Sequence, residues 1–295
     1  MIDRYLLRYF LAVIDKGNFS KAAAQCNVSQ PTLSVGIAKL ERLLDKPLFH
    51  RTNRRVELTE AGAHLAVHAR RIEGDFNLFE RSMTEAPARS TIRLGVLATI
   101  PSAWIAVFAR GLATAAVDER VELVEGRERD LVERLGRGRI DAALTLVRED
   151  GSRFESEILR SEGYALALSV DHPLARETVI PAESLADNVM IVRRHCEVLA
   201  ETSQHFTSRG VRPFFAARTT SDDRALALVA AGMGVTVMPE GFKAPDVARP
   251  RLAGFELRRD IGIMYATHYG RPRGLESPVL VALRNAISGE SSTRQ

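Results

Sequence analysis

Three observations predict the fold class of this chain, which is α/β with an all-α winged helix-turn-helix N-terminal domain and a two-lobed C-terminal domain. Apolar residues recur at helical spacing as far as Leu44, and one long amphipathic pattern follows. After Arg89, short apolar runs alternate with helical patterns, which is typical of an α/β domain. We place the domain limits at 1–58, 59–88 and 89–295.

The composition is that of an ordinary globular protein. The chain has 295 residues, 45% hydrophobic and 26% charged, so it is long enough for domains with separate cores. No run approaches the roughly 20 apolar residues of a membrane helix, and the first residues do not resemble a secretion signal. The two cysteines, Cys26 and Cys196, form neither a metal-binding spacing nor a disulfide framework. We therefore expect a cytoplasmic protein without a cofactor or a membrane partner.

The positive charge is concentrated near the N-terminus. The formal net charge is +4, and the residues up to Glu60 carry ten Lys and Arg against six Asp and Glu, so the remainder is neutral. A local basic excess is typical of a domain that binds a polyanion. Only the first fifth of the chain is therefore expected to contact nucleic acid.

Three helices are expected at the start of the chain. Residues 3–16 carry apolar side chains at helical spacing, and a short alanine-rich helix follows to about Gln25, with Ser20 as its cap or in its first turn. The third helix starts at Ser29, a favourable N-cap, and proline suits its first turn because no N–H is needed there. Two helices joined by so short a turn form a helix-turn-helix. Residues 50–59 then predict a hairpin, or wing, with its charges at the tip.

The first turns of the third helix carry small polar side chains. A helix that enters the major groove docks by these turns, where such side chains reach base edges and the helix dipole suits phosphate. A basic cluster after the helix would bind phosphates or a narrow minor groove. We therefore expect double-stranded DNA as a partner, contacted by Ser29, Gln30, Pro31, Thr32, Ser34, Val35, Lys39, Arg51, Arg54 and Arg55. The alternative is a helical bundle that binds no DNA and exposes a solvated charge patch.

A long polar helix is expected from Thr59 to about Thr84. Its apolar residues form one narrow stripe, with Leu65, Ile72 and Phe79 seven residues apart. Such a helix is poorly stable alone, so we expect it to dimerise with the same helix of a second copy. Packing of the stripe on its own domain is the alternative.

The C-terminal part alternates strand and helix patterns. The strand-like runs are TIRLGVLAT, RVELVEG, IDAALTLV, YALALSV, NVMIV, FFAARTT, GVTVMP and GIMYAT, with helical segments such as ERDLVERLG and DDRALALVAAG between them. Open α/β sheets bind ligands beyond the C-terminal ends of their strands. The length of this part suits two lobes with a ligand cleft between them.

The stretch from LRYFLAVIDKGNFSKAAAQ to NRRVELTEAG resembles the DNA-binding domain of LysR-type transcriptional regulators almost position by position. The segments VEGRERDLVERLGRGRIDAALT, DHPLA and ALALVAAGMGVTVMP are similar to the effector-binding domain of that family, in the same order. The resemblance implies a winged helix-turn-helix, a dimerising linker helix and a two-lobed periplasmic-binding-protein-like domain. It also implies a transcriptional regulator that assembles as a homotetramer, a dimer of dimers.

Two positions of the third helix depart from the family pattern. Val35 stands where the family usually has a basic or polar residue, and Gly36 follows it. Val35 can meet a thymine methyl group, so base readout at this position does not carry over from the family. Glycine inside a helix costs about 1 kcal/mol relative to alanine. Gly36 therefore either permits close approach to DNA or to a neighbouring helix, or is tolerated drift.

The resemblance also implies that a small anionic metabolite binds between the lobes. The first strand ends beside Pro101 at a helix start, where free N–H groups favour a carboxylate, and other strands end in threonines. The segment VRRHCEV offers the best charged anchor. We expect a carboxylate-bearing effector bound by Thr99, Ser102, Thr145, Arg193, His195 and Thr219. The alternative is that the hydroxyl groups among them only cap helices.

Two other functions stay open. Cys196 lies where peroxide-sensing members of the family carry a reactive cysteine, and a thiol beside arginines at a helix start can have a lowered pKa. However, the domain has no second cysteine to resolve it. A solute-binding protein or an enzyme built on the two lobes would need an export signal or a catalytic motif, and neither is evident. We expect no enzyme activity and no metal site, because His64 and His68 lack a third ligand.

Overall fold

The computed structural model describes the chain except for residues 52–55, 85–90, 116–117, 149–153 and 290–295. It forms two compact units, each with its own contacts. Unit 1 comprises Met1–Arg89 with Val132–Asp141 and Tyr265–Gly270, and unit 2 comprises Ser90–Leu131, Ala142–Met264 and Arg271–Gln295. In the described part of the chain, no helix is both long and apolar enough to cross a membrane.

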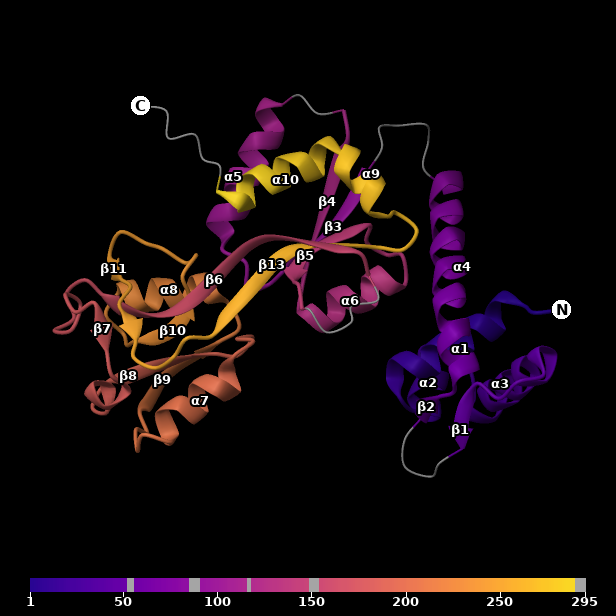
Figure 1. The fold of residues 1–295 in the computed structure, drawn as a ribbon, viewed down its shortest axis with the longest axis horizontal. Helices are drawn as coiled ribbons and strands as arrows, with labels where there is room; N and C mark the ends of the chain where they lie inside the picture. Colours follow the sequence, from indigo (N-terminus) through magenta and orange to yellow (C-terminus); the bar gives the residue numbers. More distant parts are fainter. Residues whose placement is uncertain (52–55, 85–90, 116–117, 149–153, 290–295) are drawn as a thin grey trace. The chain divides into compact units, whose positions relative to one another are not determined.

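Unit 1 begins with the three expected helices, α1 (Arg4–Lys16), α2 (Phe19–Gln25) and α3 (Gln30–Leu44) (Figure 1). Their apolar faces enclose a common core that includes the fully buried Phe10, Leu33 and Leu40. Because each helix is short, this shared burial supplies most of its stability.

The ends of these helices follow from single residues. α1 ends at Gly17, whose φ of 60° is a left-handed conformation that glycine adopts without strain. The Asn18 side chain caps α2 by accepting from the backbone N–H groups of Ser20 and Lys21 at 2.9 and 3.1 Å. Ser20 is therefore a first-turn residue. Ser29 caps α3 by accepting from the N–H of Thr32 at 3.2 Å, as expected.

The wing consists of β1 (Phe49–Arg51) and β2 (Val56–Leu58), which pair antiparallel with Phe49 opposite Leu58. Its tip, with Arg54 and Arg55, lies outside the described residues. The buried side chain of Phe49 packs against Phe10 at a centroid distance of 5.3 Å. The hairpin is thereby attached to the core of the three helices.

The long helix α4 (Glu60–Thr84) follows directly. Its start is capped by Thr59 Oγ1, which accepts from the N–H of Gly62 at 3.0 Å. The first turns pack on the three-helix core through Ala66 and Ala69. Farther along α4, large apolar side chains are exposed.

Unit 2 is built on a seven-stranded mixed sheet in the order β10-β6-β13-β5-β3-β4, with β11 also paired to β6. Three strands are parallel: β3 (Thr91–Leu97), β4 (Arg120–Gly126) and β5 (Ala142–Leu146). The long β6 (Ser156–Ser169) runs antiparallel to β13 (Arg258–Tyr265), β10 (Thr236–Pro239) and β11 (Val247–Ala248). One sheet thus runs through the whole unit.

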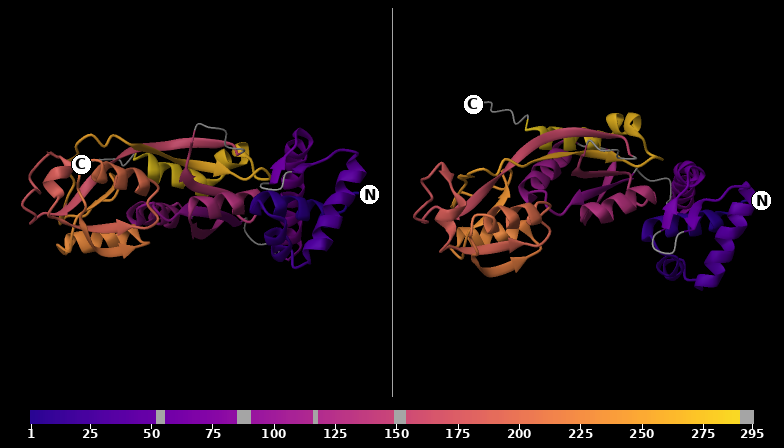
Figure 2. Two further views of the ribbon diagram at one scale, coloured as in Figure 1. Left: turned by 90° about the horizontal axis from the view of Figure 1, so that it is seen from below. Right: turned by 60° about the horizontal axis from the view of Figure 1, so that its bottom comes forward.

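β6 and β13 connect two lobes (Figures 1 and 2). Lobe 1 contains β3, β4 and β5 with the adjacent helices α5 (Ser102–Thr114) and α10 (Pro278–Ser288). In lobe 2, β8 (Val189–Arg193) pairs in parallel with β9 (Phe214–Thr219), accompanied by α7 (Leu199–Thr207) and α8 (Asp222–Ala230). The remaining elements are α6 (Glu128–Gly136), β7 (Val179–Ile180), η1 (Ala182–Leu185), β12 (Arg251–Leu252) and α9 (Arg271–Glu276).

The strands differ from the expectation mainly in length. β6 begins at Ser156 rather than at Tyr164, and β13 begins at Arg258 rather than at Gly262. The first half of β6 is only partly buried, whereas the residues from Gly163 onward are all buried. An apolar run therefore reveals the second half alone.

Candidate DNA interface and effector site

One face of α3 is exposed to solvent, and the side chains on this face take no part in the core. Pro31, Thr32, Val35 and Lys39 lie on this face, and Val35 has 68% of its surface exposed. The opposite face, including Leu33 and Ile37, is buried. An exposed valine at the centre of a polar face is available for apolar contact with a base.

Polar side chains at the start of α3 bond to one another. Ser29 Oγ lies 2.7 Å from Thr32 Oγ1, and Gln30 Nε2 donates to Ser34 Oγ at 2.9 Å. Both hydrogen bonds are exposed, so the groups can exchange these partners for base edges at little cost. The predicted contact residues of α3 therefore lie together on an accessible helix start.

Gly36 is explained by a neighbouring helix. A Cβ atom at this position would lie 2.7 Å from Cδ2 of Tyr9 in α1 and 3.5 Å from Leu6 Cδ2. Of the readings left open above, close approach to a neighbouring helix is the one that the contacts support. The absence of a side chain lets α3 pack closely on α1.

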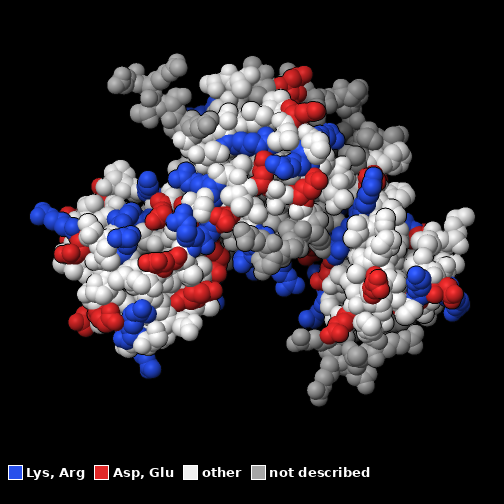
Figure 3. All heavy atoms as spheres, in the orientation of Figure 1, with Lys and Arg blue, Asp and Glu red and all other residues white. Residues whose placement is uncertain are grey.

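The basic residues of the wing are described only in part. Arg51 ends β1, but its side chain lies outside the described residues, as do Arg54 and Arg55. Their contacts with DNA stay a prediction. On the face drawn in Figure 3, basic and acidic side chains are interspersed over unit 2.

The stripe on α4 divides into two parts. Leu65 is partly buried against the three-helix core. Ile72, Phe76 and Phe79 have 39%, 42% and 58% of their surface exposed, which is unusual for three large apolar residues on one helix.

Residues of both lobes meet around Arg259, at the start of β13; we call this the lobe junction. The buried guanidinium donates to Glu162 of β6 at 2.7 and 2.8 Å and pairs with Glu197 of lobe 2 at 2.5 Å. It also donates to the carbonyl oxygen and to Oγ1 of Thr99, in lobe 1, at 3.0 and 3.2 Å. Burial lowers the pKa of Arg259, but Glu197 and Glu162 raise it by more, so the net shift is upward.

Two further contacts join the lobes. Ser102 Oγ, at the start of α5, donates to Asp223 Oδ2, at the start of α8, at 2.5 Å. Trp104 of α5 lies against Gly241 of lobe 2, where no side chain would fit. The Arg160 guanidinium lies 4.8 Å from the centroid of the Trp104 ring system.

Arg193 is not a free anchor for an anion. Its guanidinium forms a buried two-point ion pair with Asp222 and donates to the carbonyl of Val237 at 3.0 Å. Burial lowers the pKa of Arg193, but Asp222, together with Cys196 and Glu197, raises it by more, so the net shift is upward. The carboxylate that neutralises Arg193 comes from the protein, so direct binding of the effector by Arg193 stays an untested prediction that these contacts do not favour.

The other predicted effector residues differ in their contacts. Thr219 is buried and its Oγ1 accepts from the N–H of Ser221 at 3.1 Å, so this hydroxyl supports the start of α8. Thr145 is fully buried, and in the described part of the chain its Oγ1 has no hydrogen-bond partner. His195 is only partly buried, but its Nδ1 atom is enclosed and likewise has no hydrogen-bond partner in the described part of the chain. Of the six residues, Thr99 and Ser102 are the ones with contacts that cross the lobe junction.

Comparison with known families decides the classification. The model of the family described as "Bacterial regulatory helix-turn-helix protein, lysR family" matches residues 5–63, and that of the "LysR substrate binding domain" matches residues 85–290. The chain belongs to the LysR family. It is thus a LysR-type DNA-binding transcriptional regulator with an effector-binding domain, and the fold class expected from the sequence is confirmed.

Relatives with curated names span nearly the whole regulator. The chain is 31% identical over 274 residues to the "Probable hydrogen peroxide-inducible genes activator" of Mycobacterium avium, covering 90% of this chain and 88% of the relative. It is 30% identical over 244 residues to the "Probable cat1 operon transcriptional activator" of Acinetobacter lwoffii, covering 81% and 80%. Both relatives are named as regulators of transcription.

Solved structures agree in fold. A cysteine-to-aspartate variant of full-length OxyR from Pseudomonas aeruginosa matches with a TM-score of 0.54 and 23% identity, covering 97% of this chain and 95% of that one. Full-length BenM matches with a TM-score of 0.51 and 23% identity, with the same coverage.

Cys196 of this LysR-type regulator is a poor nucleophile in the state described. Burial raises its pKa, and the nearby Arg193 lowers it by less. Arg193 Nη1 lies 3.5 Å from the Cys196 sulfur. At neutral pH the group is therefore a thiol rather than a thiolate.

Sequence reasoning missed the charged residues that hold the junction. Arg259 and Glu162 escaped because neither lies in a motif, and Glu197 escaped although it lies in the segment VRRHCEV, where only the basic residues were considered; each pairs with a residue far away in sequence. One signal was available: Arg259 and Glu162 both interrupt or precede apolar strand patterns, and a charge within a buried strand needs a partner. The Asp222-Asp223 pair at a helix start was a second.

Proposed function

We propose that this LysR-type regulator binds a small polar effector at the lobe junction and changes its control of transcription as the lobes rearrange. The supporting observation is the buried Arg259, which is shared between Thr99 of lobe 1 and Glu197 of lobe 2. Two buried polar atoms near it, Tyr164 Oη and Glu197 Oε2, make no well-formed hydrogen bond in the described residues, although the two side chains are close enough to each other for Glu197 to raise the pKa of Tyr164. Buried groups of this kind are normally satisfied by water or by a ligand.

The ligand acts by competing for contacts between the lobes. A polar molecule that bonds to Ser102 or to Asp223 replaces their mutual hydrogen bond, and the lobes then settle at a different angle. Coupling of this kind requires only that the effector bind one arrangement better, by typically about 1–3 kcal/mol.

The effector is proposed to carry a carboxylate together with a cationic or hydrogen-bond-donating group. A carboxylate is suited to the start of α5, which no side chain caps. The two arginines of the ion pairs here are already occupied, because Glu162 and Glu197 pair with Arg259 and Asp222 pairs with Arg193, while Asp223 faces the start of α5. A simple anion is therefore disfavoured relative to a zwitterion.

The other parts of the chain are assigned accordingly. The domain limits are proposed at residues 58 and 88, with DNA bound by the exposed start of α3 and by the wing. We propose a cytoplasmic, non-enzymatic regulator without a cofactor, which assembles through α4 as a dimer and then as a tetramer. The exposed Ile72, Phe76 and Phe79 support the dimer.

The effector proposal is tested by screening zwitterionic metabolites for a raised melting temperature of the full-length protein, since a ligand that binds the native state stabilises it. Ser102→Ala and Asp223→Asn should abolish the shift for a confirmed ligand, and should leave operator binding without ligand intact. Thr114→Ala, in the last turn of the same helix as Ser102, is the matched control. A ligand whose effect is indifferent to Ser102 and Asp223 would refute the site.

DNA binding is tested separately. Arg54→Ala/Arg55→Ala should weaken binding to specific and to random duplex alike and flatten the salt dependence, because phosphate contacts carry no sequence information. Thr32→Ala should instead relax sequence preference. Full affinity with an unchanged salt slope in the double arginine variant would contradict the assignment of the wing.

A peroxide response through Cys196 is the second candidate, because a relative 31% identical is named a hydrogen peroxide-inducible genes activator. Its thiolate would attack one peroxide oxygen, giving a sulfenic acid and, after protonation, water. The raised pKa and the lack of a second cysteine after Cys26 weigh against it. Loss of a peroxide response in a Cys196→Ser reporter strain would favour this candidate, and an unchanged response would exclude it.

A further inference from the structure

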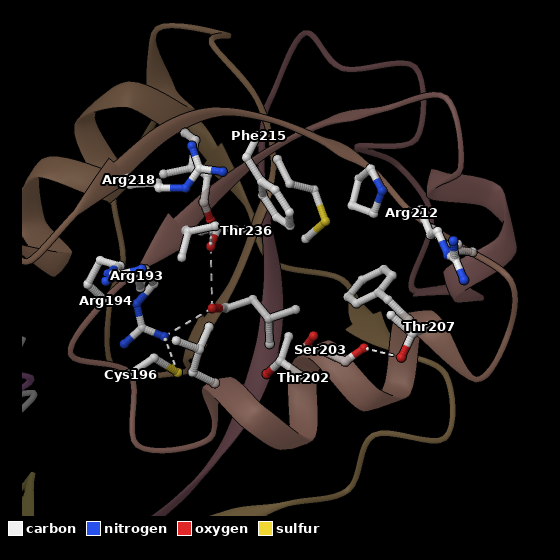
Figure 4. A pocket seen from close by; sticks show the side chains of 18 residues that line it. Arg193, Arg194, Cys196, Thr202, Ser203, Thr207, Arg212, Phe215, Arg218 and Thr236 are labelled. Carbon is white, nitrogen blue, oxygen red and sulfur yellow. Dashed lines mark hydrogen bonds between the residues drawn. The ribbon is translucent and has the colours of Figure 1, made fainter.

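A cavity of about 400 Å³ lies within lobe 2, between α7 and the paired strands β8 and β9 (Figure 4). Its lining comes from β8, the turn after it, α7, β9 and the start of β10, and includes no residue of lobe 1. Its volume falls within the range of small-molecule sites. The cavity therefore lies within lobe 2 and shares with the surroundings of the lobe junction only the Arg193 side chain, which Asp222 already neutralises.

The interior of the cavity is mostly apolar, because its two buried polar residues already have partners: Arg193 pairs with Asp222, and Thr236 Oγ1 donates to the carbonyl of Ile191. Met190, Ile191, Phe206 and Val211 line it and are themselves buried. Phe215 of β9 also lines it and has 38% of its surface exposed, which places an aromatic ring between the interior and solvent. An apolar ligand group would gain burial here without displacing a polar partner.

The charges at the rim all have one sign. Arg194, Arg212 and Arg218 line the cavity and are exposed, and its lining residues, all of them described, include no Asp or Glu. Figure 4 shows Arg212 at one end of the cavity and Arg194 at the other, with Arg218 beside Phe215. The Arg218 guanidinium lies 5.6 Å from the centre of the Phe215 ring. This rim differs from the lobe junction, where Arg259 is paired with Glu162 and Glu197.

We propose that this cavity binds an amphipathic organic anion, with an alkyl chain or aromatic ring inside and a carboxylate on the arginine rim. Arginine holds carboxylates by paired, charge-assisted hydrogen bonds, which are stronger than neutral ones. The interior buries the apolar part of the ligand, and the arginines of the rim favour a ligand with a negative charge. A neutral apolar ligand would use the interior alone, and a cation would meet repulsion.

The charge of the ligand is tested with three compounds of one chain length: octanoate, octanol and octylammonium. Binding to the full-length protein is measured by thermal shift and by isothermal titration. Octanoate should bind more tightly than octanol by about tenfold, the value of one charge-assisted hydrogen bond, and octylammonium should bind least. Equal binding of all three, or preference for octylammonium, would overturn the proposal.

The location is tested by filling the cavity. Ser203 of α7 is exposed and lines it, so Ser203→Trp should abolish octanoate binding. Gln204→Trp is the matched control, because the neighbouring Gln204 is exposed and does not line the cavity. Octanoate binding that survives in the first variant, or is lost equally in both, would contradict this location.

The rim is tested by Arg194→Gln/Arg212→Gln/Arg218→Gln. This variant should lose the preference for octanoate over octanol while its binding of octanol is unchanged. An undiminished preference would overturn the role of the arginines.

Cys196 supplies an independent readout, because it lines the cavity. At alkaline pH, where a thiol with a raised pKa begins to ionise, octanoate should slow the labelling of Cys196 by N-ethylmaleimide, followed by mass spectrometry of the peptide. Cys26 in unit 1 serves as the internal control. Because these measurements require neither DNA nor the lobe junction, failure of the proposed effector site would leave them unaffected. Equal labelling of Cys196 with and without octanoate would count against the cavity.

Discussion

The Arg193 and Asp222 side chains have 1% and 2% of their surface exposed, and the two groups neutralise each other inside lobe 2. Removing one partner of a buried ion pair leaves an uncompensated charge, whereas replacing both by apolar residues of similar volume is often neutral. Each of the two residues is therefore needed for stability only as long as the other is present.

Asp222→Ala is expected to lower the free energy of unfolding by about 3–5 kcal/mol, because it leaves the buried guanidinium of Arg193, which is not deprotonated in proteins, without its counter-charge. Arg193→Met/Asp222→Leu should lower it far less. Urea denaturation of the full-length protein measures both, with Asp187→Ala as a control at an exposed carboxylate of lobe 2. Equal losses in the single and the double variant would show that packing, and not the unpaired charge, decides the result.

His205 gives lobe 2 a dependence on pH. The ring packs edge-on against Phe206 and Phe255, and burial lowers its pKa, with Arg209 lowering it further and Glu183 and the Ala253 carbonyl opposing. A lowered pKa means that the unfolded chain binds the proton more readily than the folded one. The stabilisation is complete above the unfolded pKa of about 6.5 and is lost as the pH falls through it toward the folded pKa.

We therefore expect the melting temperature of the full-length protein to fall between pH 7 and pH 5 more steeply than that of His205→Phe. Scanning calorimetry at several pH values measures the difference. Parallel curves for the two proteins would show that His205 does not contribute to the acid sensitivity.

At the scale of elements, the contact between α1 and α3 depends on Gly36. An alanine there gains about 1 kcal/mol of helix propensity but brings its Cβ to 2.7 Å from Tyr9 Cδ2. Gly36→Ala should therefore destabilise the protein in the presence of Tyr9 and stabilise it in a Tyr9→Ala background. Chemical denaturation of the four proteins of this double-mutant cycle tests the coupling, and additive effects would refute it.

Elements with a complete apolar face could be predicted, and those without one could not. The three N-terminal helices and the buried strands followed from spacing because burial on one side leaves a periodic pattern. The partly buried start of β6 and the two-residue strands β7, β11 and β12 leave no such pattern. Among the site residues, Ser29 was predictable as a cap from local chemistry, whereas the bonds of Arg259 join Thr99 and Glu162 across long sequence separations.

At the scale of the whole molecule, α4 governs assembly in our proposal. Ile72→Lys or Phe79→Glu should convert the dimer to a monomer, because a charge placed in an apolar interface has no partner. Sedimentation measures the mass of the assembly. Operator affinity should fall together with this mass, because a monomer contacts only one half-site of the operator. Val67→Lys is the control, since Val67 is 62% exposed on α4 outside the proposed stripe. A dimer that persists in both stripe variants would place the interface elsewhere.

The contact of Trp104 with Gly241 has a practical consequence. Trp104 is the only tryptophan of the chain, and its neighbours are Gly241 of lobe 2 and the Arg160 guanidinium. The fluorescence of the indole ring depends on nearby charge and on access of water, so any separation of the lobes changes its emission wavelength and intensity. The regulator thus contains an intrinsic fluorophore at the contact between lobe 1 and lobe 2. Stopped-flow mixing with a ligand can time their movement without a dye or an introduced label.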